Sequence, residues 1–103
     1  MIFITPSEAL GQTAAAMRQH RIRQNLTQED LAHKSGVALA TLRKFERTGL
    51  IAMESFFKLA TVLGLLETML AAIAPKDEYA SLDDMMKENK KPKRVRVKPG
   101  KKS

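Results

Sequence analysis

The sequence predicts an all-α fold, a compact domain of four to five helices. Three observations support this class: apolar residues recur at helical spacing, polar residues with capping chemistry stand where segments begin, and glycines stand where they end. The last residues are mostly Lys, Arg, Pro and Gly, which is typical of a disordered basic tail. We therefore divide the chain into a domain over 1–75, a linker over 76–89 and a basic tail over 90–103.

The first helix is expected from Pro6 to about Arg23. Thr5 can cap this helix, Pro6 suits its first position, and Glu8 can close a capping box. The apolar side chains expected to face inward are Leu10, Ala14, Met17 and Ile22. The cations expected on its solvated face are Arg18, Arg21 and Arg23.

Residues 26–46 predict two short helices joined by a tight turn, with bounds near 28–35 and 38–47. Thr27 is a good N-cap, and Asp30 three residues later approximates a capping box. Gly36 supplies a backbone that can turn, and the next side chain, that of Val37, is expected in the core. This arrangement is a helix-turn-helix motif, which usually presents its second helix to the DNA major groove.

A helical projection at about 100° per residue divides the second helix of this motif into two faces. One continuous, mostly apolar face holds Ala38, Thr41, Leu42 and Phe45. The other face holds three cations and two small or apolar side chains, which are Arg43, Lys44, Arg47, Leu39 and Ala40. The first face is expected to pack on the domain, and the second to meet phosphates and base edges.

A fourth helix is expected from about Met53 to Leu63, with Gly64 at its end. Its apolar residues at helical spacing are Phe56, Leu59, Ala60 and Leu63. Residues 65–74 are either a fifth helix or a strand, because periodicity does not decide between the two in a short apolar run. Either alternative places Met69, Leu70 and Ile73 at an interface. A short amphipathic helix is expected within the linker, over about 82–88.

The net charge of +7 is unevenly distributed. Residues 87–103 hold nine of the 18 Lys and Arg and one acid, so their net charge is +8, whereas residues 1–86 carry −1. Within that body, residues 18–47 carry +4 and residues 48–86 carry −4. The basic part of the body therefore coincides with the helix-turn-helix motif, which favours a nucleic-acid partner.

Several other classes of function are not expected. The chain has no Cys, and His20 and His33 fall in different expected helices, so a metal site is not expected. No apolar run is long enough to cross a membrane, and the N-terminal residues lack the pattern of a signal peptide, so the default location is cytoplasmic. Without a Gly-rich phosphate loop or a nucleophile beside a base, neither catalysis nor a cofactor is expected.

Six stretches of the chain match the pattern of a known family in register. They are Leu26-Thr27-Gln28-Glu29-Asp30-Leu31-Ala32, Ser35-Gly36-Val37, Ala40-Thr41-Leu42, Phe45-Glu46-Arg47, Phe57-Lys58-Leu59-Ala60 and Leu63-Gly64. Through them, the segment from Met17 to about Leu70 resembles the lambda-repressor/Cro-like, or XRE-type, helix-turn-helix family. Within that family it looks most similar to HipB-type antitoxins, which dimerise, bind their own operators and associate with HipA-type Ser/Thr kinase toxins.

This resemblance implies a set of DNA-binding residues, which are Gln28, Ala38, Leu39, Ala40, Thr41, Arg43, Lys44 and Arg47. Gln28 would donate a hydrogen bond to a phosphate or support the second helix of the motif. Leu39 stands where relatives often carry a polar reader. Leu39 and Ala40 can contact a thymine methyl group but cannot form bidentate hydrogen bonds, so direct readout falls mainly to Arg43 and Lys44. Ala38 is also a poor N-cap, where relatives often carry Ser.

The resemblance implies a sequence-specific, homodimeric transcriptional repressor on a palindromic operator. It also implies the HipB-like antitoxin of a type II toxin–antitoxin operon, bound to a HipA-like kinase toxin. Residues 65–74 would then be a dimerisation strand. The alternatives are a stand-alone XRE-type regulator, and an interaction subunit that holds a kinase, with DNA binding secondary. The basic tail has three interpretations: a nonspecific DNA arm, a ligand for an acidic patch of a partner, or a solvated end.

Overall fold

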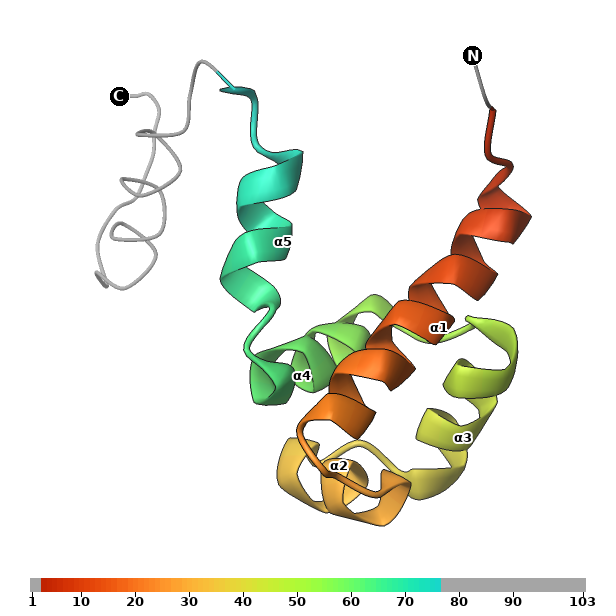
Figure 1. The fold of residues 1–103 in the computed structure, drawn as a ribbon, viewed down its shortest axis with the longest axis vertical. Coiled ribbons are helices and arrows are strands. Elements are labelled where there is room, and N and C mark those ends of the chain that lie inside the picture. Colours follow the sequence, from red (N-terminus) through yellow and green to blue (C-terminus); the bar gives the residue numbers. More distant parts are fainter. Residues whose placement is uncertain (1–2, 77–103) are drawn as a thin grey trace, which may run out of the picture. The chain divides into compact units, whose positions relative to one another are not determined.

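The computed structural model describes residues 3–76, and these residues form five helices (Figure 1). The helices are α1 (Pro6–Arg23), α2 (Gln28–Ser35), α3 (Leu39–Thr48), α4 (Met53–Leu63) and α5 (Leu66–Ile73). The all-α class is confirmed, and the expected bounds of the first, second and fourth helices agree with the structure. The short helix predicted over 82–88 and the basic tail lie outside the described residues.

Two capping boxes fix where α1 and α2 begin. The Thr5 hydroxyl accepts the backbone N–H of Glu8, and the Glu8 carboxylate accepts the backbone N–H of Thr5, both at 3.0 Å. Thr27 and Asp30 form the same reciprocal pair at 2.9 and 3.0 Å. The backbone N–H groups at the start of a helix have no carbonyl partner within the helix. Each capping box supplies acceptors for two of these donors.

Gly49 ends α3 and allows α1 to approach that end closely. Its backbone lies in the left-handed region at φ +82°, which side chains other than hydrogen disfavour. An ideal Cβ built on Gly49 would lie 2.5 Å from the backbone oxygen of Leu10 and 2.7 Å from the Leu10 Cβ. Glycine is therefore required here both for its φ angle and for the space between α1 and α3.

The four helices from α1 to α4 enclose the core. α1 packs on α3 and on α4, and α2 packs on the same two helices. The buried apolar side chains are Ala14, Met17, Leu31, Val37, Leu42, Phe45, Leu59, Ala60 and Leu63. The Phe45 ring meets the Phe56 ring edge-on at a centroid distance of 5.8 Å. The helix-turn-helix formed by α2 and α3 is thus supported by packing against α1 and α4.

The expected inward face of α1 needs correction. Ala14 and Met17 are buried as predicted, but Ile22 is 43% exposed and Leu10 is also exposed. Arg21, predicted on the solvated face, is buried instead. The physical reason is that Arg21 finds a carboxylate and a backbone carbonyl inside the domain, which compensate for the water that its guanidinium loses.

Leu66–Ile73 form the helix α5, so of the two alternatives for residues 65–74 the fifth helix is confirmed and the dimerisation strand is wrong. Leu65 donates its backbone N–H to the carbonyl of Ala60 at 2.8 Å, beside the left-handed Gly64 that caps α4. The Leu66–Ile73 run then continues with residues of good helix propensity, such as Leu, Glu, Met and Ala. Helix propensity therefore favours a helix in this segment, where the apolar pattern alone did not distinguish a helix from a strand.

Candidate nucleic-acid interface

α3 has a buried face and an exposed basic face. Leu42 and Phe45 are almost completely buried, whereas Arg43, Lys44 and Arg47 are exposed. The two-faced helix predicted from the projection is therefore present, with its three cations pointing away from the core. We call these three residues the basic face of α3. Their positive charge on an accessible helix is suited to phosphates and to the acceptor groups of base edges.

The remaining candidate residues of α3 lie around its first turn. Ala40 is exposed, and Leu39 and Thr41 are half-buried. Ala38 was predicted on the packing face, but it is exposed, because it precedes the helix as the N-cap residue and does not continue its buried face. Only part of the Leu39 side chain is thus available for an apolar contact with a base.

The N-terminus of α3 differs from those of α1 and α2. The N-cap Ala38 offers no side-chain hydrogen bond, as its identity predicted, whereas α1 and α2 each begin with a complete capping box. The first backbone N–H groups of a helix need acceptors, and the helix dipole is positive at this end. An anion such as a phosphate is a suitable acceptor at this position.

A buried ion pair fixes α3 against α1. The guanidinium of Arg21 binds the carboxylate of Glu46 in a bidentate manner, at 2.7 Å from Nε and 3.0 Å from Nη2. The side chains of Arg21 and Glu46 are only 10% and 6% exposed. Arg21 also donates from Nη1 to the backbone carbonyl of Leu26 at 2.8 Å, so it joins α1, the α1–α2 loop and α3.

Gln28 connects α2 to the same pair. Its side-chain amide nitrogen donates to the Glu46 carboxylate at 2.9 Å, and the Gln28 residue is half-buried. Of the two alternatives for Gln28, support of α3 is the one with a contact in the structure. An amide nitrogen has two hydrogens, so the bond to Glu46 uses only one of them.

The sequence reasoning missed this network, although one signal for it was present. Arg21 follows Ala14 and Met17 at the i, i+3, i+7 spacing of a buried helix face, and this spacing places its guanidinium toward the core. An arginine at such a position needs a carboxylate partner. The partner, Glu46, lies 25 residues further along the chain, so no local pattern identifies it.

A second ion pair lies on the surface between α2 and α3. The Nη2 atom of Arg43 is 3.2 Å from the Oε2 atom of Glu29, and the two side chains are 53% and 63% exposed. Arg43 is one of the two residues, with Lys44, that are expected to contribute most to direct readout of DNA. In the free protein, its guanidinium therefore already has an anionic partner.

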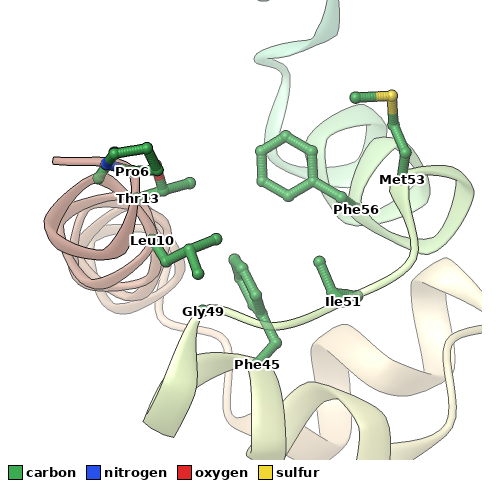
Figure 2. A pocket seen from close by; sticks show the side chains of 9 residues that line it. Pro6, Leu10, Thr13, Phe45, Gly49, Ile51, Met53 and Phe56 are labelled. Atoms are coloured by element: carbon green, nitrogen blue, oxygen red, sulfur yellow. The ribbon is translucent and has the colours of Figure 1, made fainter.

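A hollow of about 340 Å³ lies on a different part of the domain, between the start of α1, the α3–α4 loop and the start of α4 (Figure 2). Its lining residues are Pro6, Ala9, Leu10, Thr13, Phe45, Gly49, Ile51, Met53 and Phe56. None of these side chains is titratable, and the Thr13 hydroxyl is their one polar group. The lining therefore supplies no side chain that could act as a general acid or base.

Within residues 3–76, no three His, Cys, Asp or Glu side chains gather where they could hold a metal ion. The same residues include no helix with the length and apolar character needed to cross a membrane.

Comparison with protein families places part of the chain in a known family. A family model described as helix-turn-helix matches residues 17–68, which is half of the chain. The matched segment runs from the middle of α1 to the start of α5 and includes the whole of α2 and α3. Comparison with curated proteins and with solved structures gives no match.

Proposed function

The chain belongs to the lambda-repressor/Cro-like (XRE-type) helix-turn-helix family of DNA-binding transcription regulators, and from this premise we propose that it is a homodimeric repressor of a palindromic operator. In this proposal each subunit inserts α3 into the major groove of one half-site. Operators read by this motif usually mirror the two-fold symmetry of the protein, with half-sites one helical turn or a multiple of it apart.

The observation that carries this proposal is the basic face of α3. Three cations are exposed on a helix whose opposite side, Leu42 and Phe45, is anchored in the core. A helix held in this way can position side chains against base edges with little loss of conformational freedom on binding. The net charge of +4 over residues 18–47 supports the same surface, because it attracts the phosphate backbone.

We assign the candidate residues to three kinds of contact. Arg43 and Lys44 would contact acceptor groups of bases, guanine above all, and Arg47 would contact the backbone. The apolar Leu39 and Ala40, with Thr41, would lie near thymine methyl groups, and exposed Ala38 would bring the N-terminus of α3 to a phosphate. Gln28 would use its second amide hydrogen for a phosphate while it holds Glu46.

We further propose that the protein is the HipB-like antitoxin of a toxin–antitoxin operon and binds a HipA-like Ser/Thr kinase. This second proposal is supported by the resemblance of Ala40-Thr41-Leu42, Phe45-Glu46 and Phe56-Phe57-Lys58 to HipB-type proteins. The kinase would bind outside α3, because the basic face is needed for DNA. The acidic sequence over residues 48–86, with a net charge of −4, or the C-terminus would supply that contact.

Two measurements test the proposal. Selection of binding sites from random duplex DNA should yield a palindromic sequence, bound by two copies of the chain in light scattering. An asymmetric site bound by one copy would contradict the repressor dimer.

Co-expression with a kinase gene found next to the coding sequence should then give a complex that co-elutes in size-exclusion chromatography. If the kinase elutes alone, the antitoxin proposal is wrong and a stand-alone regulator remains.

A further inference from the structure

We propose that Glu29 is a specificity-determining residue. Its carboxylate restrains the Arg43 side chain in the free protein and makes Arg43 less available to nonspecific DNA. This inference rests on the proposed function, because it assumes that α3 enters the groove. Glu29 itself is not among the residues expected to touch DNA. Its role follows from the pair that it forms with the cation best suited to direct readout.

The geometry places the carboxylate beside the proposed contact surface. Glu29 is the second residue of α2, and Arg43 lies on the exposed face of α3. Their atoms meet at 3.2 Å, so the guanidinium is held toward the N-terminal turn of α2. Among residues 3–76, no acid lies within ion-pair distance of Lys44 or Arg47, so the restraint acts on Arg43 alone within the basic face.

The other nearby acids are already engaged. Asp30 accepts the backbone N–H of Thr27 in the capping box, and Glu46 is occupied by Arg21 and Gln28. Glu29 has no such internal partner besides Arg43 in the described part of the chain. Its carboxylate is therefore a free negative charge whenever Arg43 leaves it.

The exposure of the pair makes it exchangeable. Both side chains are more than half exposed, so water and salt screen their attraction and an incoming anion can replace Glu29. In nonspecific binding the incoming groups are anionic phosphates, which compete with the Glu29 carboxylate for the guanidinium of Arg43. A phosphate that displaces Glu29 leaves an uncompensated carboxylate beside the DNA backbone, and the two negative charges repel each other.

Specific binding does not carry the same penalty. A guanine edge offers two neutral acceptors, O6 and N7, which use two of the five N–H groups of arginine. The remaining N–H groups can stay on the Glu29 carboxylate, so the pair survives and fixes the plane of the guanidinium. Glu29 thus disfavours the nonspecific complex more than the operator complex. The ratio of operator affinity to nonspecific affinity is therefore higher with Glu29 than without it.

The test compares Glu29→Gln with the matched control Glu54→Gln in the full-length protein. Glu54 is also the exposed second residue of a helix, α4, and no cation of residues 3–76 lies within ion-pair distance of it. Affinities are measured by fluorescence anisotropy for the selected operator duplex and for random-sequence duplexes. The Glu29→Gln protein should bind random duplexes more tightly by up to about five-fold, the range of an exposed ion pair, and the operator by less. The specificity ratio should fall accordingly, and the control should leave it unchanged.

A double-mutant comparison identifies the mechanism. In an Arg43→Ala background, the effect of Glu29→Gln should shrink to that of Glu54→Gln, because no guanidinium remains to be released. An unchanged specificity ratio in Glu29→Gln, or a full effect without Arg43, would overturn the inference while operator binding by the native chain still stands. A native chain that binds no DNA would refute the proposed function, and the inference with it.

Discussion

Replacing Arg21 with alanine should lower the free energy of unfolding by about 3–5 kcal/mol, because it leaves a buried carboxylate without its cation. Arg21 makes three hydrogen bonds, two to Glu46 at 2.7 and 3.0 Å and one to the Leu26 carbonyl at 2.8 Å. After its removal, Glu46 keeps only the 2.9 Å bond from Gln28. Since a small domain has about 5–15 kcal/mol of stability in total, this loss is a large part of it.

Urea denaturation followed by circular dichroism measures this effect. The control is Arg43→Ala, which removes the cation of the exposed pair with Glu29 and should cost less than about 1 kcal/mol. The difference between the two variants tests burial as the deciding factor, because both lose an arginine and both leave a glutamate behind. If Arg21→Ala were within about 1 kcal/mol of Arg43→Ala, the buried network would not hold α3 as we describe.

Two further predictions concern the turn after α3 and the cap of α2. Gly49→Ala should lower the free energy of unfolding in urea by about 2–5 kcal/mol, because its Cβ would meet Leu10 and its φ is +82°. Gly36→Ala has a similar φ but open space around the Cβ, so it should lower the same free energy by about 1–2 kcal/mol. Equal losses would contradict the close approach of α1 to Gly49. Hydrogen bonds from the backbone and hydroxyl of Thr27 hold the pKa of Asp30 below its ordinary value of 3.8. The ionised carboxylate therefore stabilises the fold fully above about pH 4, and this stabilisation is lost as the pH falls through the lowered pKa. The stability difference between the native protein and Asp30→Asn should therefore be constant above about pH 4 and shrink in more acidic buffer, and a difference independent of pH would refute this role.

The helix bounds were predictable because the forces that set them are local. Thr5 with Glu8, and Thr27 with Asp30, satisfy backbone donors three residues away, so the sequence alone identifies both starts. The two faces of α3 were predictable for a similar reason, since its apolar residues repeat at the helical period. Ala38 was misplaced because that projection assumed a helix one residue longer at its start.

Contacts between distant residues were not predictable in the same way. The Arg21–Glu46 pair spans 25 residues, and an arginine on a helix is more often solvated than buried. The pair between Glu29 and Arg43 depends on the angle at which α2 and α3 meet, which their sequences do not specify.

The operator affinity of Arg43→Ala shows whether the basic face of α3 contacts the operator. We expect a loss of about 1–3 kcal/mol and a relaxed preference at one base position of each half-site in repeated site selection. Lys58→Ala, which removes an exposed cation from α4, is the control and should leave that preference intact. A folded Arg43→Ala protein with native affinity and native base preference would contradict that contact.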